Sequence, residues 1–267
     1  MARIHFLGTC SGTEPMPNMH HTSFLLECGG AFYWFDAGEG CAHTAHTTGL
    51  DVLKTRAVFI SHPHIDHTGG LANLLSCMRK LIVREKRSLP NDNSLDIFLE
   101  CPEVLNAVKV IVLEGQADGN LRFTMREHGI SDGTIFEDEN IRVSALHNRH
   151  LGEDGSNGWH SFSFFIEADG RKIVYSGDLK NITECDELIA GGCDAFIMET
   201  GHHAVRDVCE YAVSKGVGAL YFNHHGREIL GNRAAAEALT LEYSQSSGIP
   251  IKIAYDTMCV AVRKSNS

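Results

Sequence analysis

Residues 60–70 read ISHPHIDHTGG, and no other segment constrains the chain as strongly. The apolar run AVFIS that leads into this segment predicts a short buried β-strand. His62 and His64 follow the strand, and Asp66 and His67 lie where the chain turns into a helix. Because the chain turns there, the four side chains can converge on one point. Imidazole and carboxylate groups together suit a divalent metal such as zinc, so the segment predicts a metal centre at the end of a strand.

The composition excludes several classes of protein. The chain has 267 residues, of which 43% are hydrophobic, and this is enough for a substantial core. Its 23 basic and 34 acidic residues give a net charge of −11, which argues against general binding of nucleic acid or of an anionic membrane. Apolar runs stay well below the ~18 residues that span a membrane, so no membrane partner is expected.

The cysteines and the start of the chain predict a location. The nine cysteines form no C-x-x-C pair, and the opening MARIHFLGTC lacks the long apolar stretch of a secretion signal. Reduced thiols without such a signal are typical of the cytoplasm, which is the predicted location.

Strand-like and helix-like runs mix in both halves of the chain. This mixture predicts an α/β protein whose sheets pack against helices. With no internal repeat and no low-complexity linker, residues 1–267 are expected to form one domain. The strand-like runs are 3–8, 22–28, 31–38, 55–61, 140–146, 160–168, 171–178, 193–200 and 217–226. The helix-like runs are 68–84, 103–113, 204–216 and 233–248.

The His-x-His-x-Asp-His segment resembles the metal-binding motif of the metallo-β-lactamase superfamily. Four further motifs of that family occur in the expected order, and the resemblance covers about residues 3–260. FDAGEG supplies an acidic residue, Asp36, after an early strand, and YSGD supplies Asp178 after a later one. The segments VSALHNRHL and LYFNHHG supply the remaining histidines. The resemblance implies a four-layer αββα sandwich with its site where the strand ends meet.

Two of these motifs contain a choice between two histidines. In VSALHNRHL the spacing of the family favours His150 over His147 as a metal ligand. The stretch LYFNHHGRE resembles the LTH-x-S-x-R stretch of the ribonuclease Z branch. That alignment makes His224 the ligand and leaves His225 as a residue of the substrate pocket.

The resemblance implies two divalent ions and a complete set of ligands. Zinc is the expected metal, although manganese or iron would suit the same donors. Asp36 is expected to orient a ligand histidine from behind, as metal sites commonly require. The implied ligands are His62, His64 and His150 for one metal, Asp66, His67 and His224 for the other, and Asp178 as the bridge.

The start of the chain points to one branch of the superfamily. FLGTCSGTEP and FDAGEG resemble the corresponding stretches of ribonuclease Z and its phosphodiesterase-like relatives. His202 lies 22 residues before His224, the spacing at which a histidine of this branch reaches the scissile phosphate. Glu199 matches the branch and would hold His202, whereas Met198 and Ala204 replace a histidine and a threonine of its pattern.

The predicted activity is hydrolysis of a phosphodiester by a metal-bridged hydroxide. The ions lower the pKa of a bound water toward about 7, so hydroxide is available at neutral pH. Asp66 is assigned as a ligand that orients this nucleophile, and His202, held by Glu199, as the group that protonates the leaving oxygen. Arg227 is the candidate for binding the substrate phosphate together with His225, and a surface salt bridge is the alternative for Arg227.

The expected substrate depends on the hairpin predicted over residues 160–178. Ribonuclease Z enzymes of bacteria carry a long tRNA-gripping arm in this region, where the chain has only HSFSFFIEADGRKIVYSGD. With the net acidity, this favours a small phosphodiester or nucleotide-type substrate over tRNA 3′-processing. Hydrolysis of a lactone, thioester or sulfate ester on the same fold is a further alternative. A non-catalytic scaffold is disfavoured because no implied ligand is missing.

Two surface features leave alternatives open. The basic residues between Arg79 and Arg87 would either steer a polyanion or form a solvated helix face. Relatives of this branch often dimerise across helices near the active site, so the resemblance also raises a homodimer as the assembly.

Overall fold

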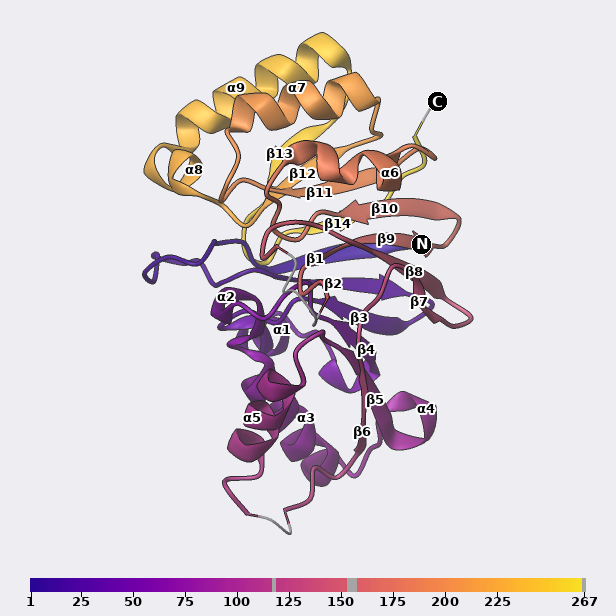
Figure 1. Ribbon diagram of the computed structural model, residues 1–267. Helices are drawn as coiled ribbons and strands as arrows, with labels where there is room; N and C mark the ends of the chain where they lie inside the picture. The colour runs from indigo at the N-terminus through magenta and orange to yellow at the C-terminus, as the bar shows by residue number, and fades with distance from the viewer. Residues whose placement is uncertain (117–118, 153–157, 266–267) are drawn as a thin grey trace.

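The computed structural model describes residues 1–116, 119–152 and 158–265. Two seven-stranded sheets pack face to face, and helices cover the outer face of each sheet (Figure 1). The first sheet has the order β14 (Cys259–Ala261), β1 (Arg3–Gly8), β2 (Ser23–Cys28), β3 (Ala31–Phe35), β4 (Thr55–Phe59), β5 (Ser94–Phe98) and β6 (Thr124–His128). The second has the order β13 (Ile251–Ile253), β12 (Leu220–Asn223), β11 (Ala195–Glu199), β10 (Arg171–Tyr175), β9 (Phe162–Ala168), β8 (Ile141–His147) and β7 (Gly133–Glu137).

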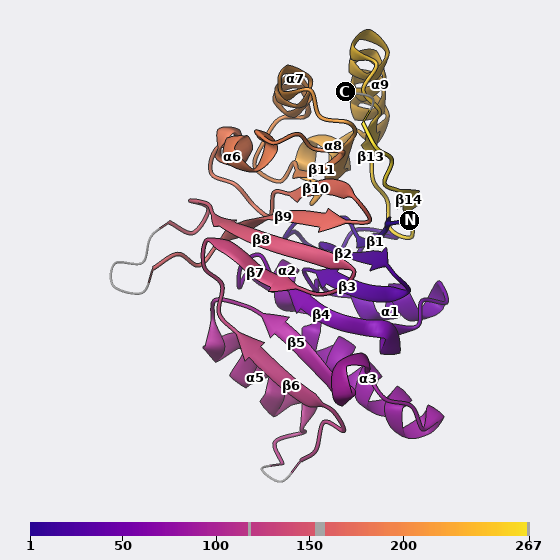
Figure 2. The same cartoon turned by 90° about the vertical axis from the view of Figure 1, so that its right-hand side faces the viewer.

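The helices form the two outer layers, and each layer comes from one half of the sequence (Figure 2). Those over the first sheet are α1 (Cys41–Thr47), α2 (Ile65–Thr68), α3 (Leu71–Glu85) and α5 (Pro102–Val112), with the short 3-10 helix η1 (Val52–Lys54). The short α4 (Pro90–Asn93) lies on the other side of β5 and β6 from α3 and α5 (Figure 1). Those over the second sheet are α6 (Asp186–Ile189), α7 (Val205–Lys215), α8 (Arg227–Gly231) and α9 (Arg233–Ser247), with the 3-10 helix η2 (Ile182–Cys185). The predicted αββα sandwich is therefore confirmed.

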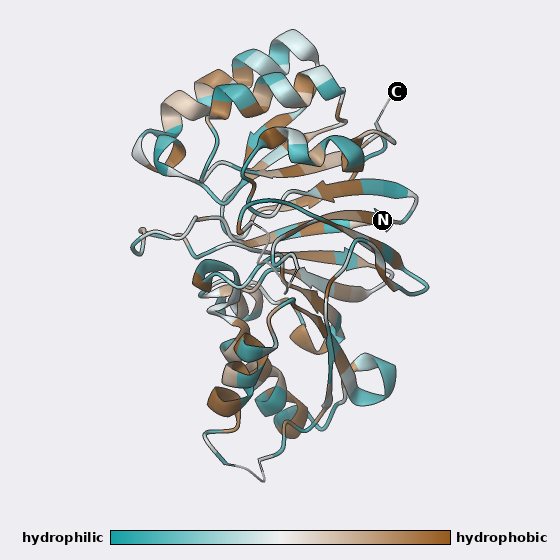
Figure 3. Cartoon of the chain, in the orientation of Figure 1, coloured by the Kyte–Doolittle hydropathy of each residue, from teal (hydrophilic) through white to brown (hydrophobic). Residues whose placement is uncertain are grey.

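Apolar side chains separate into three layers of core, one between the sheets and one under each set of helices (Figure 3). The central layer is rich in aromatic rings. Phe59 on β4 lies in its middle, with ring centroids 5.0 Å from Phe35, 4.9 Å from Phe98 and 6.2 Å from Phe164. Such rings bury a large apolar area each, and they fix how the two sheets sit on one another.

Parallel strands bring the predicted site residues to one edge of the sandwich. Phe35 of β3 pairs with Phe59 of β4 in parallel register, and β10, β11 and β12 are also parallel. The carboxyl ends of these strands therefore meet, as they do in open α/β sheets that bind ligands. Most strands are one to a few residues shorter than predicted, and β3 and β12 end where Asp36 and His224 adopt left-handed backbone conformations, with φ of 59° and 49°. β3 therefore ends directly before Asp36, and β12 ends directly before His224.

Two tight hairpins agree with their sequences. Gly29 and Gly30, which connect β2 to β3, both have positive φ, as the favoured two-residue turn requires. Asp169 and Gly170 alone join β9 to β10, so this hairpin carries no inserted arm. No helix within the described ranges is long and apolar enough to cross a membrane.

Candidate metal centre

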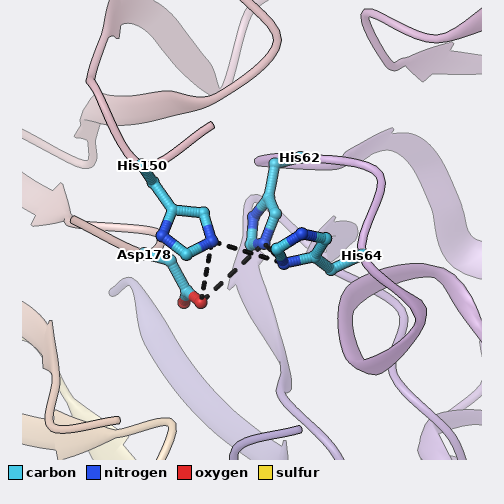
Figure 4. Close-up of side chains that lie close together, drawn as sticks. All are labelled: His62, His64, His150 and Asp178. Atoms are coloured by element: carbon cyan, nitrogen blue, oxygen red, sulfur yellow. Dashed lines mark hydrogen bonds and ion pairs between the residues drawn. The ribbon is translucent and has the colours of Figure 1, made fainter. Parts of the chain in front are cut away.

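The first group of donors surrounds Asp178, which follows β10 (Figure 4). His62 and His64 reach it from the loop after β4, and His150 reaches it from the loop after β8. His62 Nε2 and His150 Nε2 lie 3.8 and 3.7 Å from Asp178 Oδ2, and His64 Nδ1 lies 3.0 Å from His62 Nε2. Three imidazoles and a carboxylate thus face one point, as a divalent metal requires.

The second group of donors lies on the other side of Asp178. Asp66 and His67 belong to α2, and His224 directly follows β12. His224 Nε2 is 3.0 Å from Asp66 Oδ2 and 3.3 Å from Asp178 Oδ2, while His67 Nε2 is 3.3 Å from Asp178 Oδ1. Asp178 is therefore the residue that contacts donors of both groups, the position expected of a bridging ligand.

Unsatisfied buried atoms show that this donor set fits metal ions. His67 Nε2 and Asp178 Oδ1 are buried, yet neither has a hydrogen-bond partner of good geometry among the described residues. Leaving such groups unpaired costs about 1–3 kcal/mol each, so buried polar atoms normally have partners. A divalent cation between them would satisfy both atoms. The chain accordingly has a divalent-metal site built from imidazole and carboxylate donors.

Burial and neighbouring charges set the protonation states of three of the donors. Burial lowers the pKa of His62 well below its usual value and that of His150 to about 4, so both rings are neutral and keep a lone pair for a metal. Burial alone would raise the pKa of Asp178, but His224 and His67 outweigh it and lower the pKa well below its ordinary range. The carboxylate of Asp178 is therefore ionised at any pH near neutrality.

Asp36 holds the second group in place from behind. It is fully buried, and its Oδ2 lies 2.7 Å from His67 Nδ1. The backbone N–H of Ser61 donates to Asp36 Oδ1 at 2.6 Å, and the hydroxyls of Ser61 and Tyr175 donate to Oδ2. A carboxylate that accepts from His67 Nδ1 keeps the proton on that atom, which leaves Nε2 free to bind a metal.

Replacing Asp36 with asparagine should weaken metal binding without removing any ligand. The amide can present its N–H to His67 Nδ1, which favours the wrong tautomer. We expect the affinity for the metal bound by His67 to fall about 10–100-fold. Competition with a chelator measures this affinity, and Asp132→Asn, at a carboxylate outside the cluster, is the matched control. Equal affinities in wild type and Asp36→Asn would contradict the orienting role.

Glu199 and His202 form a third unit at the open side of the cluster. Glu199, at the end of β11, is buried and accepts hydrogen bonds from the backbone N–H groups of His202 and Leu179. Its Oε1 lies 3.0 Å from His202 Nδ1, and the His202 side chain is 43% exposed. His202 Nδ1 lies 3.8 Å from Asp178 Oδ2. The hydrogen bond to Glu199 raises the pKa of His202 above its usual value, so the ring can carry a proton at the mouth of the site.

The structure places the two members of each pair of competing histidines in different surroundings. His147 lies outside the cluster: its Nδ1 is 2.7 Å from Asp132 Oδ2, and its ring stacks on Trp159. His225 is fully buried, with Nε2 2.9 Å from the carbonyl oxygen of Ala254. A substrate cannot reach a ring in that position, so the structure does not place His225 in the substrate pocket.

The basic candidates are engaged elsewhere. Arg227 forms a two-pronged ion pair with Glu14 and therefore does not present a free guanidinium to the site. On α3, Arg84 pairs with Glu85 and Arg79 donates to a backbone carbonyl, and Arg87, just after the helix, also pairs with Glu85. These contacts favour a solvated helix face over a polyanion-binding patch.

Two contributors were not predicted from the sequence. Tyr175 reaches Asp36 across the central core from the opposite sheet, and no spacing in the sequence signals this contact. Gly12 passes over Asp66 so closely that an added Cβ would lie 2.9 Å from the carboxylate. The last glycine of FLGTCSG, Gly12 itself, is the only local sign in the sequence of this close approach.

Comparisons with known proteins agree with the fold. Ribonuclease Z of Methanothermobacter thermautotrophicus is 24% identical over an alignment that spans 100% of this chain and 99% of the relative. The crystal structure of human tRNase Z, short form, superposes with a TM-score of 0.69 at 18% identity and covers 98% of this chain and 99% of its own. A diphosphatase of the PhnP family gives a TM-score of 0.64 at 14% identity, with 99% of each chain covered.

The fold and the clustered histidines and aspartates define a metal-dependent hydrolase of the metallo-β-lactamase fold, similar to ribonuclease Z. A family model described as anti-Pycsar protein Apyc1 matches residues 2–205, which is more than half of the chain. The chain belongs to that family.

Proposed function

We propose that the chain hydrolyses small phosphodiesters or nucleotide-type substrates with two divalent metals, zinc in the first place. The observation that carries the proposal is the Glu199–His202 pair, which sets a proton donor beside the two donor groups. Hydrolysis of an ester with a poor leaving group needs such a donor in addition to an activated water. The similarity to a ribonuclease Z and to a diphosphatase supports a phosphate-containing substrate.

The residues of the chain divide the work. His62, His64 and His150 would hold one metal, Asp66, His67 and His224 the other, and Asp178 both. When bound, the ions lower the pKa of water and offset negative charge on the phosphoryl oxygens. Asp66 orients the attacking water in addition to its role as a ligand. His202 gives its proton to the departing oxygen, and Glu199 keeps the proton-bearing ring in position.

A small substrate is favoured over tRNA. The two-residue turn between β9 and β10 leaves no arm at this hairpin, and the net charge of −11 disfavours a polyanion. The likeness to ribonuclease Z over nearly the full length keeps tRNA 3′-processing as the second candidate. All nine cysteines lie in the described ranges and none is in a disulfide, which supports the reducing cytoplasm as the location.

Metal content and turnover test the proposal together. Elemental analysis should find about two metals per chain, as a dinuclear centre requires. Removing the metals with a chelator should lower turnover of bis(p-nitrophenyl) phosphate by roughly a thousandfold, and restoring zinc, manganese or iron separately should identify the active metal. Two bound metals without phosphodiester turnover would shift the assignment to a lactone, thioester or sulfate ester. A chain that binds no metal under any loading condition would contradict the enzyme assignment.

A further inference from the structure

The loop between β1 and β2 forms one rim of the metal centre. Its backbone passes over Asp66 at Gly12, and Ser11 anchors it by donating from both N–H and hydroxyl to the carbonyl oxygen of His225. In Figure 1 this indigo segment projects to the left between α2, which carries Asp66, and α8, which begins just after His224. This end of the loop therefore lies beside the second group of donors.

An ion pair joins this rim to the opposite one. The two oxygens of Glu14 lie 3.0 and 2.5 Å from Nη1 and Nη2 of Arg227, the first residue of α8. Both side chains are open to solvent, at 62% and 65% exposure. Arg227 lowers the pKa of Glu14 to about 2, so the pair is charged on both sides at neutral pH. An exposed ion pair of this kind adds little to the free energy of unfolding. Its main effect is on the electrostatic potential around the loop.

The composition of the loop gives weight to the neutralisation of Arg227 by Glu14, because the loop itself supplies no lysine or arginine. Residues 4–53, which include the whole loop, contain no lysine or arginine. Arg227 is therefore the cation that faces this rim from α8, and Glu14 cancels its charge. A second phosphate arriving here would gain Arg227 but meet Glu14 at the same place, with no net attraction. The single charge of a phosphodiester, held by the metals, would be unaffected.

We infer that Glu14 determines specificity: by cancelling the charge of Arg227, it withholds from a further phosphate beside the scissile one the attraction that Arg227 alone would give. The site then gives such substrates no advantage over phosphodiesters that carry one negative charge. This inference rests on the proposed function and narrows its substrate class. A nucleic acid backbone, in which every scissile phosphate has charged neighbours, likewise gains no attraction at this rim.

Two esters with the same leaving group test the inference on the metal-loaded protein. Thymidine 5′-(p-nitrophenyl phosphate) carries one negative charge, and its 3′-phosphorylated form carries an additional phosphate. Wild type should not favour the second in kcat/KM. Glu14→Gln should shift the ratio of the two kcat/KM values about tenfold toward the second at low salt, with most of the effect lost near 0.5 M salt. Arg227→Gln leaves Glu14 uncompensated and should shift this ratio by a similar factor toward the first.

The opposite signs separate a field effect from damage to the loop, because loss of loop structure would move both variants in one direction. Glu85→Gln is the matched control, since Glu85, the last residue of α3, also forms ion pairs with arginines, Arg84 and Arg87, but at a different surface. Its ratio of the two kcat/KM values should equal that of wild type. An unchanged ratio in Glu14→Gln, or shifts of the same sign in both rim variants, would overturn the inference while leaving phosphodiester hydrolysis intact.

A binding measurement keeps the inference testable if neither ester is hydrolysed. Calorimetry with thymidine 5′-monophosphate and thymidine 3′,5′-bisphosphate gives the ratio of their Kd values without any turnover. Glu14→Gln should shift this ratio about tenfold toward the bisphosphate. An unchanged ratio overturns the role of Glu14. A shifted ratio without hydrolysis of either ester supports that role and counts against the proposed function alone.

Discussion

Replacing Asp178 with asparagine is expected to remove nearly all turnover and at least one metal per chain. The change keeps the shape of the side chain but removes its charge at the point where both donor groups meet. Each group then loses its shared anion, and His67 Nε2 loses the carboxylate oxygen 3.3 Å away. Charge stabilisation by bound metals contributes several kcal/mol to such reactions, so we expect roughly a thousandfold loss in kcat.

Elemental analysis and the phosphodiester assay on one preparation check this expectation. Asp132→Asn is the matched control, because Asp132 also binds a histidine, His147, but outside the cluster. It should retain about two metals and wild-type turnover. Two metals and full activity in Asp178→Asn would show that the two groups bind their ions independently, and the bridging role would be wrong. Circular dichroism on both variants distinguishes loss of metal from loss of fold.

Several residues of the candidate site could be anticipated from the sequence because they follow a strand. A strand end is visible as an apolar run that stops at a polar residue, and Asp36, His62 and Asp178 all occupy such positions. Parallel strands then bring these ends to one edge. The full set of implied ligands came instead from the resemblance to the metallo-β-lactamase superfamily. The family pattern favoured His150 and the ribonuclease Z branch favoured His224, and the structure brings both into the donor groups.

Contacts across the sandwich could not be predicted in this way. Tyr175 donates to Asp36 from the other sheet, and Glu14 meets Arg227 over 213 positions of sequence. Such contacts depend on how the two sheets pack, which no local pattern encodes. The edge strands β6 and β7 were missed for a different reason. They are short and largely exposed, so they lack the apolar run that marks a buried strand.

Replacing His202 with alanine should slow hydrolysis according to how much the leaving group needs a proton. For thymidylyl-(3′→5′)-thymidine, whose leaving group is an alkoxide, we expect a loss of about 10²–10⁴ in kcat. For thymidine 5′-(p-nitrophenyl phosphate), whose phenolate departs unprotonated, the loss should stay below about tenfold. Glu199→Gln should show the same dependence to a smaller degree, because Glu199 acts by holding the ring of His202.

The pH profile supplies an independent check of this role. Glu199 raises the pKa of His202, so the proton is present at low pH and is lost as pH rises through the raised value. Wild type should therefore lose activity on the dinucleotide at high pH, and His202→Ala should lack this limb. His147→Ala is the matched control, since His147 is also paired with a carboxylate but lies outside the cluster. Equal losses on both esters in His202→Ala would assign His202 to substrate binding, because a ring that only holds the phosphate does not distinguish the leaving groups.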